Sequence, residues 1–248
     1  MSAVMGTILQ VNQIGVSRYA DARELQKETV ERRLKGEIND TLIITEHEPV
    51  ITVGRGTPRD EKLEAGFEVI ETERGGEATY HGPGQLVVYP ILLLPEGRRD
   101  LHRYLRDLEE VVIRCLAEVE VLGERRDGLT GVWIGGKKVC SIGVTAKSWV
   151  TYHGFALNLR SDLDAFGRFR PCGLDPGVMT NLADHAELPP GNLLFQVLAV
   201  KHVCEVFGLE LPEPPDLSDA PAGSCGVDAG DESGSGGGRF PDLPIFPS

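Results

Sequence analysis

Long apolar runs and paired cysteines are both missing from this chain of 248 residues. No stretch approaches the roughly 18 apolar residues that a membrane-spanning helix requires, so we expect no membrane among its partners. The five cysteines, at positions 115, 140, 172, 204 and 225, include no C-x-x-C pair. An odd number without such a pair argues against both a disulfide framework and a structural zinc site.

Positive charge is also in short supply. The formal net charge is −13, with 25 Lys and Arg against 38 Asp and Glu, which disfavours a nucleic-acid partner. Residues 212–248 contribute −6 of this charge, with seven acids and one arginine. The N-terminus has no basic stretch before its apolar residues and lacks the Arg/Ser-rich composition of a transit peptide. A cytoplasmic protein is therefore expected.

The usual signatures of nucleotide and metal binding are absent from the sequence. Its glycine runs match neither a Walker A loop nor a Rossmann fingerprint. Glu46, His47 and Glu48 are adjacent, but side chains alternate along an extended chain, so these three should point apart. We therefore expect neither a metal nor a cofactor.

The order of the predicted elements indicates an α+β fold. Strands are expected at 7–16, 41–45, 50–56, 67–71, 86–94 and 149–159, with a hairpin over 130–147. Helices are expected at 19–35, 101–119 and 193–207. The strands come in groups and do not alternate with helices as in a doubly wound nucleotide fold. We expect one folded domain over 1–211 and a Pro/Gly/Ser-rich acidic tail over 212–248.

Two of these elements have specific local signals. Apolar residues repeat every three or four positions in the second helix, at Leu101, Leu105, Leu108, Val112, Cys115 and Val119. This stripe is typical of an amphipathic helix, and Asp100 is well placed as its N-cap. Gly135 and Gly136 stand between two β-rich arms, which predicts a tight hairpin turn.

The string from Arg74 to Pro90, RGGEATYHGPGQLVVYP, concentrates glycines next to an apolar strand. Glycine at that density indicates that the backbone passes close to another group. Arg74, His81 and Gln85 add polar groups that can orient a bound molecule. We therefore expect a binding pocket here rather than a glycine-rich hairpin with a stray histidine.

Cys172 is the one cysteine in a loop that can present a thiol, between Pro171 and Gly173. Alone, such a cysteine fits a structural role as well as a nucleophile. A thiol attacks as thiolate and needs a base or cation nearby. Lysine is rare, with seven against eighteen arginines, and a buried lysine loses its proton more readily because burial disfavours the charge. Of Lys137 and Lys138, alternation lets only one face the site.

A pairing of cysteine with histidine is the rival arrangement, because His81 and His153 each precede a glycine and follow a tyrosine. We expect His81 to line the pocket together with Gln85. For His153 we expect mainly a structural hydrogen bond.

The RGG-x-x-TYHGPGQ string resembles the signature of the lipoyl(octanoyl) transferases. Three further strings are similar to that family in the same order: GGKKVCSIGV at 135–144, YHGFALN at 152–158 and RPCGL at 170–174. The resemblance runs from about residue 40 to about residue 182. It implies a mixed β-sheet with flanking helices, the biotin/lipoate protein ligase-like fold, with the catalytic domain over 1–211.

The resemblance also implies an activity and a site. An octanoyl group would pass from octanoyl-acyl carrier protein, through a thioester on a cysteine, to a lysine of the lipoyl domains of 2-oxoacid dehydrogenases or of the glycine cleavage H protein. Cys172 matches the family's nucleophile and Lys138 its partner. The residues that would bind the substrate are Arg74, Gly75, Gly76, Glu77, Ala78, Thr79, Tyr80, His81, Gly82, Gly84, Gln85, Ser141, Ile142, Gly143, His153, Gly154, Phe155 and Ala156.

Two alternatives of other classes stay open. ATP-dependent lipoate ligases share this general fold, but their typical string has an aspartate and an asparagine where this chain has Gly82 and Gln85. Dependence on ATP separates the two activities. A non-catalytic protein that binds an acyl carrier is the third possibility, and an acyl adduct on Cys172 would exclude it.

A basic segment suggests where an acidic partner docks. Residues 97–106, GRRDLHRYLR, hold four arginines against one aspartate. Arg99, Arg103 and Arg106 recur at helical spacing, which places them on one helix face. An ordinary solvated helix face is the alternative interpretation.

Overall fold

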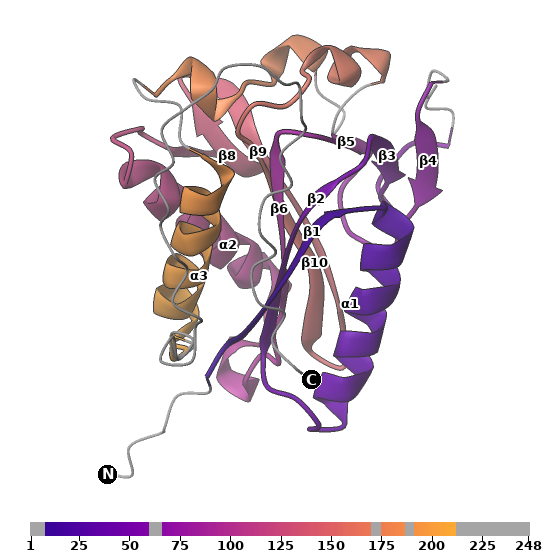
Figure 1. Cartoon of the computed structure of the whole chain (residues 1–248), viewed down its shortest axis with the longest axis vertical. Coiled ribbons are helices and arrows are strands. Elements are labelled where there is room, and N and C mark those ends of the chain that lie inside the picture. Colours follow the sequence, from indigo (N-terminus) through magenta and orange to yellow (C-terminus); the bar gives the residue numbers. More distant parts are fainter. Residues whose placement is uncertain (1–7, 60–65, 170–174, 187–190, 212–248) are drawn as a thin grey trace, which may run out of the picture. The chain divides into compact units, whose positions relative to one another are not determined.

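A seven-stranded sheet forms the centre of the protein (Figure 1). The computed structural model describes residues 8–59, 66–169, 175–186 and 191–211. In spatial order the strands are β1 (Gln10–Ser17), β2 (Thr41–His47), β6 (Gln85–Ile91), β10 (Val150–Asn158), β9 (Lys137–Lys147), β8 (Leu129–Ile134) and β7 (Glu124–Arg126). β1 and β2 pair in parallel and the other neighbours pair antiparallel, which confirms the expected mixed sheet.

A smaller sheet of three strands accompanies it. Its order is β4 (Glu68–Glu71), β3 (Val50–Val53) and β5 (Thr79–His81). β5 lies inside the glycine-rich string, where no strand was predicted before Leu86. β7 was also missed, because its three residues, Glu-Arg-Arg, carry no apolar signal.

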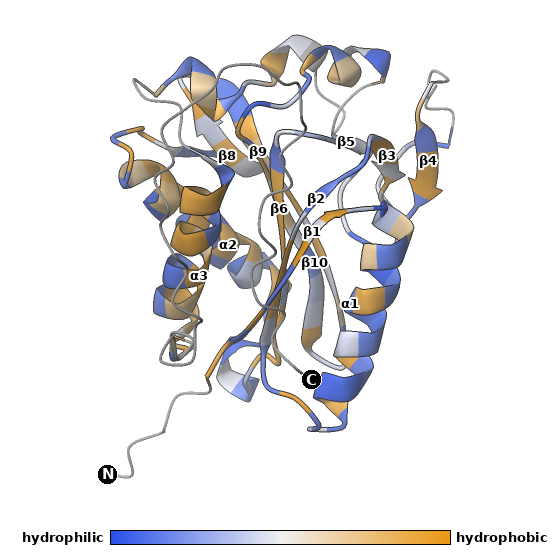
Figure 2. Cartoon of the chain, in the orientation of Figure 1, coloured by the Kyte–Doolittle hydropathy of each residue, from blue (hydrophilic) through white to orange (hydrophobic). Residues whose placement is uncertain are grey.

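Helices cover both faces of the large sheet. α1 (Tyr19–Leu34) packs against β10 and β6, whereas α2 (Leu101–Ala117) packs against β9 and β8, with α3 (Asn192–Phe207) beside α2 (Figure 1). On β2, Ile43 joins the apolar cluster under α1, while its neighbours Leu42 and Ile44 join the cluster under α2 and α3. Because both faces are covered, β6 is buried along its whole length and carries apolar residues on both faces, as the orange parts of the strand in Figure 2 indicate.

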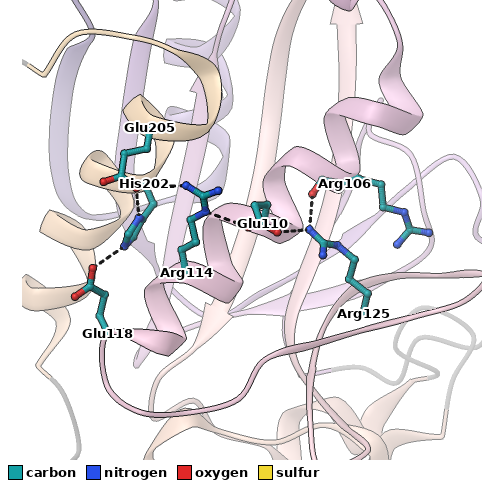
Figure 3. A network of polar contacts seen from close by, with 7 residues as sticks. All are labelled: Arg106, Glu110, Arg114, Glu118, Arg125, His202 and Glu205. Carbon is teal, nitrogen blue, oxygen red and sulfur yellow. Dashed lines mark hydrogen bonds and ion pairs between the residues drawn. The ribbon is translucent and has the colours of Figure 1, made fainter.

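The predicted signals of α2 are confirmed. Leu108, Val112 and Cys115 are buried, and the Asp100 carboxylate accepts hydrogen bonds from the backbone N–H groups of residues 102 and 103 at 2.8 and 3.2 Å. Side-chain contacts also join α2 to α3 (Figure 3). Arg114 Nη1 lies 3.5 Å from a Glu205 oxygen, and His202 Nδ1 lies 2.9 Å from the same carboxylate.

The predicted loop over 161–186 contains short 3-10 turns at Asp164–Arg168, Pro176–Val178 and Leu182–Asp184; another, Glu96–Arg98, precedes α2. Cys115, Cys140 and Cys204 are buried free thiols. Cys172, Cys225 and the tail over 212–248 lie outside the described residues. Within the described ranges, no helix is both long enough and apolar enough to cross a bilayer.

Candidate active site

The loop that contains Arg74, Gly75 and Gly76 joins the two sheets. Arg74 Nη2 donates to the carbonyl oxygen and the hydroxyl of Thr52 on β3, at 2.8 and 2.9 Å. The Gly75 N–H donates to the Val144 carbonyl of β9 at 2.9 Å. A Cβ on Gly143 would come 2.9 Å from the Gly75 carbonyl oxygen. This close approach of backbone to backbone is what the glycine density predicted.

The turn between β5 and β6 fixes the His81 ring. Gln85 donates its Nε2 to the Asn158 side-chain oxygen at 2.9 Å and to the Tyr80 carbonyl at 3.2 Å. Its Oε1 therefore faces His81 Nδ1, 2.7 Å away. An amide oxygen only accepts, so Nδ1 is the donor and the imidazole is held in one tautomer. His81 and Gln85, which we expected to line the pocket together, are thus in direct contact.

A pocket of about 440 Å³, its opening to solvent included, lies between the glycine-rich loop, α1 and strands β6, β9 and β10. We call it the β9–β10 pocket. Its lining residues are Tyr19, Arg74, Gly76, Thr79, His81, Val87, Tyr89, Ser141, Ile142, Gly143, His153, Gly154, Phe155 and Ala156. Eleven of these belong to the predicted set, although they come from three separate stretches of the sequence.

Seven predicted residues are not part of the lining as described: Gly75, Glu77, Ala78, Tyr80, Gly82, Gly84 and Gln85. Several of them support it instead. Ala78 and Tyr80 belong to a separate apolar cluster with Phe166 and Met179, because alternation along β5 turns Tyr80 away from the pocket. Gln85 acts on the pocket through the His81 ring.

Three lining residues were missed by the sequence: Tyr19, Val87 and Tyr89. Tyr19 is the first residue of a highly charged helix. An aromatic residue at that position is the feature of the sequence that could have indicated a buried role. Val87 and Tyr89 lie on the same face of β6, two positions apart, as strand alternation requires. Nothing in an uninterrupted apolar strand distinguishes that face from the other.

Buried tyrosine and histidine rings pack around one end of the pocket. His47 Nε2 lies 2.6 Å from the Tyr89 hydroxyl, and the Tyr19 ring stacks on His81 with centroids 5.8 Å apart. Burial lowers the pKa of His47 to about 4 and that of His153 to about 3, and it holds the pKa of His81 well below its ordinary value. These imidazoles are therefore neutral at pH 7.

His153 lines the pocket, as the resemblance implied, and also contributes hydrogen bonds to its surroundings. Its Nδ1 is 3.5 Å from the Tyr19 hydroxyl, at the limit of a hydrogen bond, and its ring lines the pocket. Its backbone has φ of 57°, a left-handed conformation that few residues other than glycine adopt. The backbone N–H donates to the Gln26 side chain at 2.8 Å. Its strongest structural hydrogen bond thus belongs to the backbone and not to the imidazole.

Lys138 is buried, with 3% of its surface exposed, whereas Lys137 is exposed. Since strand alternation lets only one of the two lysines face inward, these exposures identify Lys138 as the inward residue. Lys138 is the second residue of β9, three positions before the pocket residue Ser141. It pairs with Met179, and the Thr180 N–H donates to its carbonyl at 3.0 Å.

The proposed nucleophile, Cys172, lies outside the described residues. Its flanks are described: Phe169 and Met179 are buried in one apolar cluster, and Met179 is the residue that pairs with Lys138. Seven residues span at most about 25 Å, so the chain allows Cys172 to reach the lysine. Glycines and apolar side chains make up much of the lining, and its charged residue, Arg74, already donates hydrogen bonds to Thr52, so the pocket can take an uncharged chain.

Comparison with known proteins agrees with this geometry. The family described as the lipoyl protein ligase A/B catalytic domain matches residues 18–206. The octanoyltransferase of Rubrobacter xylanophilus is 51% identical over 177 residues, covering 68% of this chain and 79% of the relative. That of Gloeobacter violaceus is 46% identical over 201 residues, covering 79% and 89%.

Solved structures confirm the fold. A putative lipoate protein ligase from T. acidophilum with bound lipoic acid superposes with a TM-score of 0.65 at 16% identity, covering 85% of this chain and 89% of that one. Lipoate-protein ligase A bound with ATP gives 0.64 at 14% identity, covering 85% and 89%. The chain therefore belongs to the lipoyl protein ligase A/B catalytic domain family, and within that family to the lipoyl(octanoyl) transferases.

Proposed function

We propose that this acyltransferase moves an octanoyl group from octanoyl-acyl carrier protein to a lysine of a lipoyl domain, with Cys172 as the nucleophile and Lys138 as its partner. The acceptors are the lipoyl domains of 2-oxoacid dehydrogenases and the glycine cleavage H protein. The observation that supports this most is the β9–β10 pocket beginning three residues beyond buried Lys138. Relatives of 42–51% identity that are named octanoyltransferases support octanoyl as the group that is transferred.

The first half-reaction forms the acyl-enzyme. Lys138 takes the proton of the Cys172 thiol, and the thiolate attacks the thioester carbonyl carbon. The bond from that carbon to the carrier sulfur breaks, and the departing carrier thiolate takes a proton back from Lys138. One thioester replaces another, so the step is nearly neutral in free energy and needs no ATP.

The second half-reaction forms the product amide. The ε-amine of the acceptor lysine attacks the acyl-enzyme carbonyl, and the Cys172 thiolate leaves with the proton that the amine releases, through Lys138. An amide is more stable than a thioester, so this step proceeds downhill. Covalent catalysis of this kind predicts ping-pong kinetics.

The nearest rival is an ATP-dependent ligase, because lipoate-protein ligase A bound with ATP shares the fold. Relatives at 42–51% identity are octanoyltransferases, whereas the ligase structures match at 14–16%. An identity of 14–16% supports a shared fold but not a shared activity. Transfer from an octanoyl thioester in ATP-free buffer separates the two activities.

Intact-mass spectrometry after incubation with octanoyl-carrier protein tests the proposal. The parent protein should gain the mass of one octanoyl group, and Cys172→Ser should gain none and transfer none while remaining folded. Cys140→Ser and Cys115→Ser are matched controls, because both thiols are buried in the core, and they should keep most activity. Transfer by Cys172→Ser at near the parental rate would disprove the covalent mechanism.

A further inference from the structure

Glu109 is a fully buried carboxylate in the middle of α2, with no exposed side-chain surface. Such a charge is costly unless it is paired and hydrogen-bonded. Its oxygens lie 2.8 Å from Arg106 Nη1 and 3.2 Å from Arg125 Nε. The third partner is a backbone group, the Gly131 N–H of β8, which donates to Glu109 Oε1 at 3.1 Å. Two outer cations and one inner amide thus hold the carboxylate.

Gly131 lies directly against the Lys138 side chain. A Cβ at Gly131 would stand 2.6 Å from Lys138 Cε and 3.4 Å from Nζ, and only 2.6 Å from the Cys140 carbonyl oxygen. Its φ of 133° is one that residues with a side chain rarely adopt. The register of β8 against β9 shifts next to it, between Val132 and Trp133. The peptide that Glu109 holds is therefore the surface on which the lysine rests.

The charges of Lys138 and Glu109 both affect the pKa of the neighbouring thiol of Cys140. Burial raises the pKa of the Cys140 thiol, the Lys138 charge lowers it, and the Glu109 charge raises it again. Both charges are therefore close to the same buried sulfur.

We propose that Glu109 is a positioning residue for Lys138: it holds the Gly131 peptide and thereby sets where the lysine Nζ lies. This inference rests on the proposed function, because Lys138 matters for catalysis only if it serves Cys172. Arg106 and Arg125 anchor the carboxylate from the outer side, so that it does not turn toward the lysine and pair with it directly.

The chain offers a matched control in Glu110. It accepts from the same Arg125, at 2.6 Å, and from Arg114, at 3.0 Å, on the outer side of α2 (Figure 3). Glu110→Gln therefore disturbs the same arginine while leaving the Gly131 contact in place. Glu109→Gln keeps an oxygen that can accept from Gly131, whereas Glu109→Ala removes both the charge and the acceptor.

Two measurements test the inference, on variants shown by circular dichroism to be folded. At saturating octanoyl-carrier protein, Glu109→Ala should form the acyl adduct at least about tenfold more slowly than the parent with an unchanged KM, because the lysine is misplaced and the pocket is not. Glu109→Gln should recover a good part of that rate, and Glu110→Gln should match the parent. The Gly131 amide should exchange with D2O faster in Glu109→Ala than in Glu110→Gln.

The outcomes are distinguishable. If the parent forms no adduct, the proposed function fails and the positioning role fails with it. If the parent forms the adduct but Glu109→Ala keeps the parental rate, or raises KM alone, the positioning role is wrong and the proposed function stands. Equal exchange of the Gly131 amide in all variants would overturn the contact itself. If Glu109→Ala does not fold, Glu109→Gln with a rate below one tenth of the parent's would show that the Gly131 acceptor alone does not position the lysine, which also overturns the proposal.

Discussion

Two adjacent lysines of β9 differ in how far they are exposed to solvent. Lys138 is 3% exposed and Lys137 is exposed, although nothing but their place along β9 distinguishes them. Arginine keeps a charge at this position but does not release its proton near neutral pH. If Lys138 works as a base, Lys138→Arg should lose about 10²-fold or more of the acyl-transfer rate, nearly as much as Lys138→Ala.

The control for that experiment is Lys137→Ala, which should transfer octanoyl at the parental rate. A fixed-charge role for Lys138 predicts instead that the arginine variant keeps much of its activity. A large loss in Lys137→Ala with none in Lys138→Ala would show that the other lysine is the partner.

The buried histidines make stability depend on pH. The pKa values of His47 and His153 are lowered by burial to about 4 and about 3. Between these values and about 6.5, the unfolded chain binds more protons than the folded one, so the free energy of unfolding decreases as the pH falls. Each histidine should remove up to about 1.4 kcal/mol per pH unit below pH 6.5.

Urea unfolding at pH 7, 6 and 5 measures this slope. His47→Gln removes one of the titrating groups and should flatten it, even though the variant also loses the contact with Tyr89 and is less stable at pH 7. A slope in the variant as steep as in the parent would mean that His47 does not titrate in this way.

At the scale of elements, local sequence patterns predicted those features that depend on residues close together in the sequence. The α2 stripe and its Asp100 cap were legible in the sequence because helix periodicity and capping depend on residues within a few positions. β5 was not legible, because its three residues become a strand only by pairing with β3, nearly thirty positions earlier. Of the pocket's glycines, Gly76 stands in the glycine-dense string, whereas Gly143 and Gly154 were predicted from the family resemblance. Tyr19 and Tyr89 reach the pocket through the tertiary fold and were not predicted.

The turn between β5 and β6 requires glycine at one position. Gly84 has φ of 82°, and a Cβ there would lie 2.2 Å from the Arg160 carbonyl oxygen. Gly84→Ala should therefore lower the free energy of unfolding by about 2 kcal/mol or more. Gly97→Ala is the control, since nothing lies within 4 Å of its Cβ position, and it should cost little. Equal midpoints in thermal unfolding would contradict this assignment.

At the scale of the molecule, the arginine-rich segment over 97–106 begins far from Lys138 and ends near it, because Arg106 pairs with Glu109, which holds the Gly131 peptide against the lysine. Arg99 donates to the Leu94 carbonyl, and the Leu94 N–H donates to the Trp149 carbonyl just beyond the end of β9. Lys138 is near the other end of that strand, about 30 Å from Lys147 along it. Arg98 and Arg106 are moreover paired with Asp107 and Glu109, so that much of the local positive charge is balanced.

We therefore expect Arg99→Glu with Arg103→Glu to leave the KM for octanoyl-carrier protein unchanged at low salt. Arg168 is the better candidate for a docking contact, because it is exposed and only four positions before Cys172. Arg168→Glu should raise the KM for the carrier-bound substrate but not for a small octanoyl thioester, and salt should reduce the difference. A raised carrier KM in the double variant alone would restore the 97–106 segment as the docking surface.

Of the strands in the described ranges, β10 is the last to be synthesised, yet it lies in the middle of the large sheet, between β6 and β9. On the ribosome, β6 therefore leaves the exit tunnel with one edge and much of its apolar surface uncovered. At about 5–20 residues per second, this state lasts for several seconds before β10 follows. An unpaired apolar edge is a template for aggregation, so chains that stall before residue 150 should be insoluble or retained by chaperones. The order of synthesis thus leaves the apolar edge of β6 uncovered until β10, which also lines the pocket, has been made.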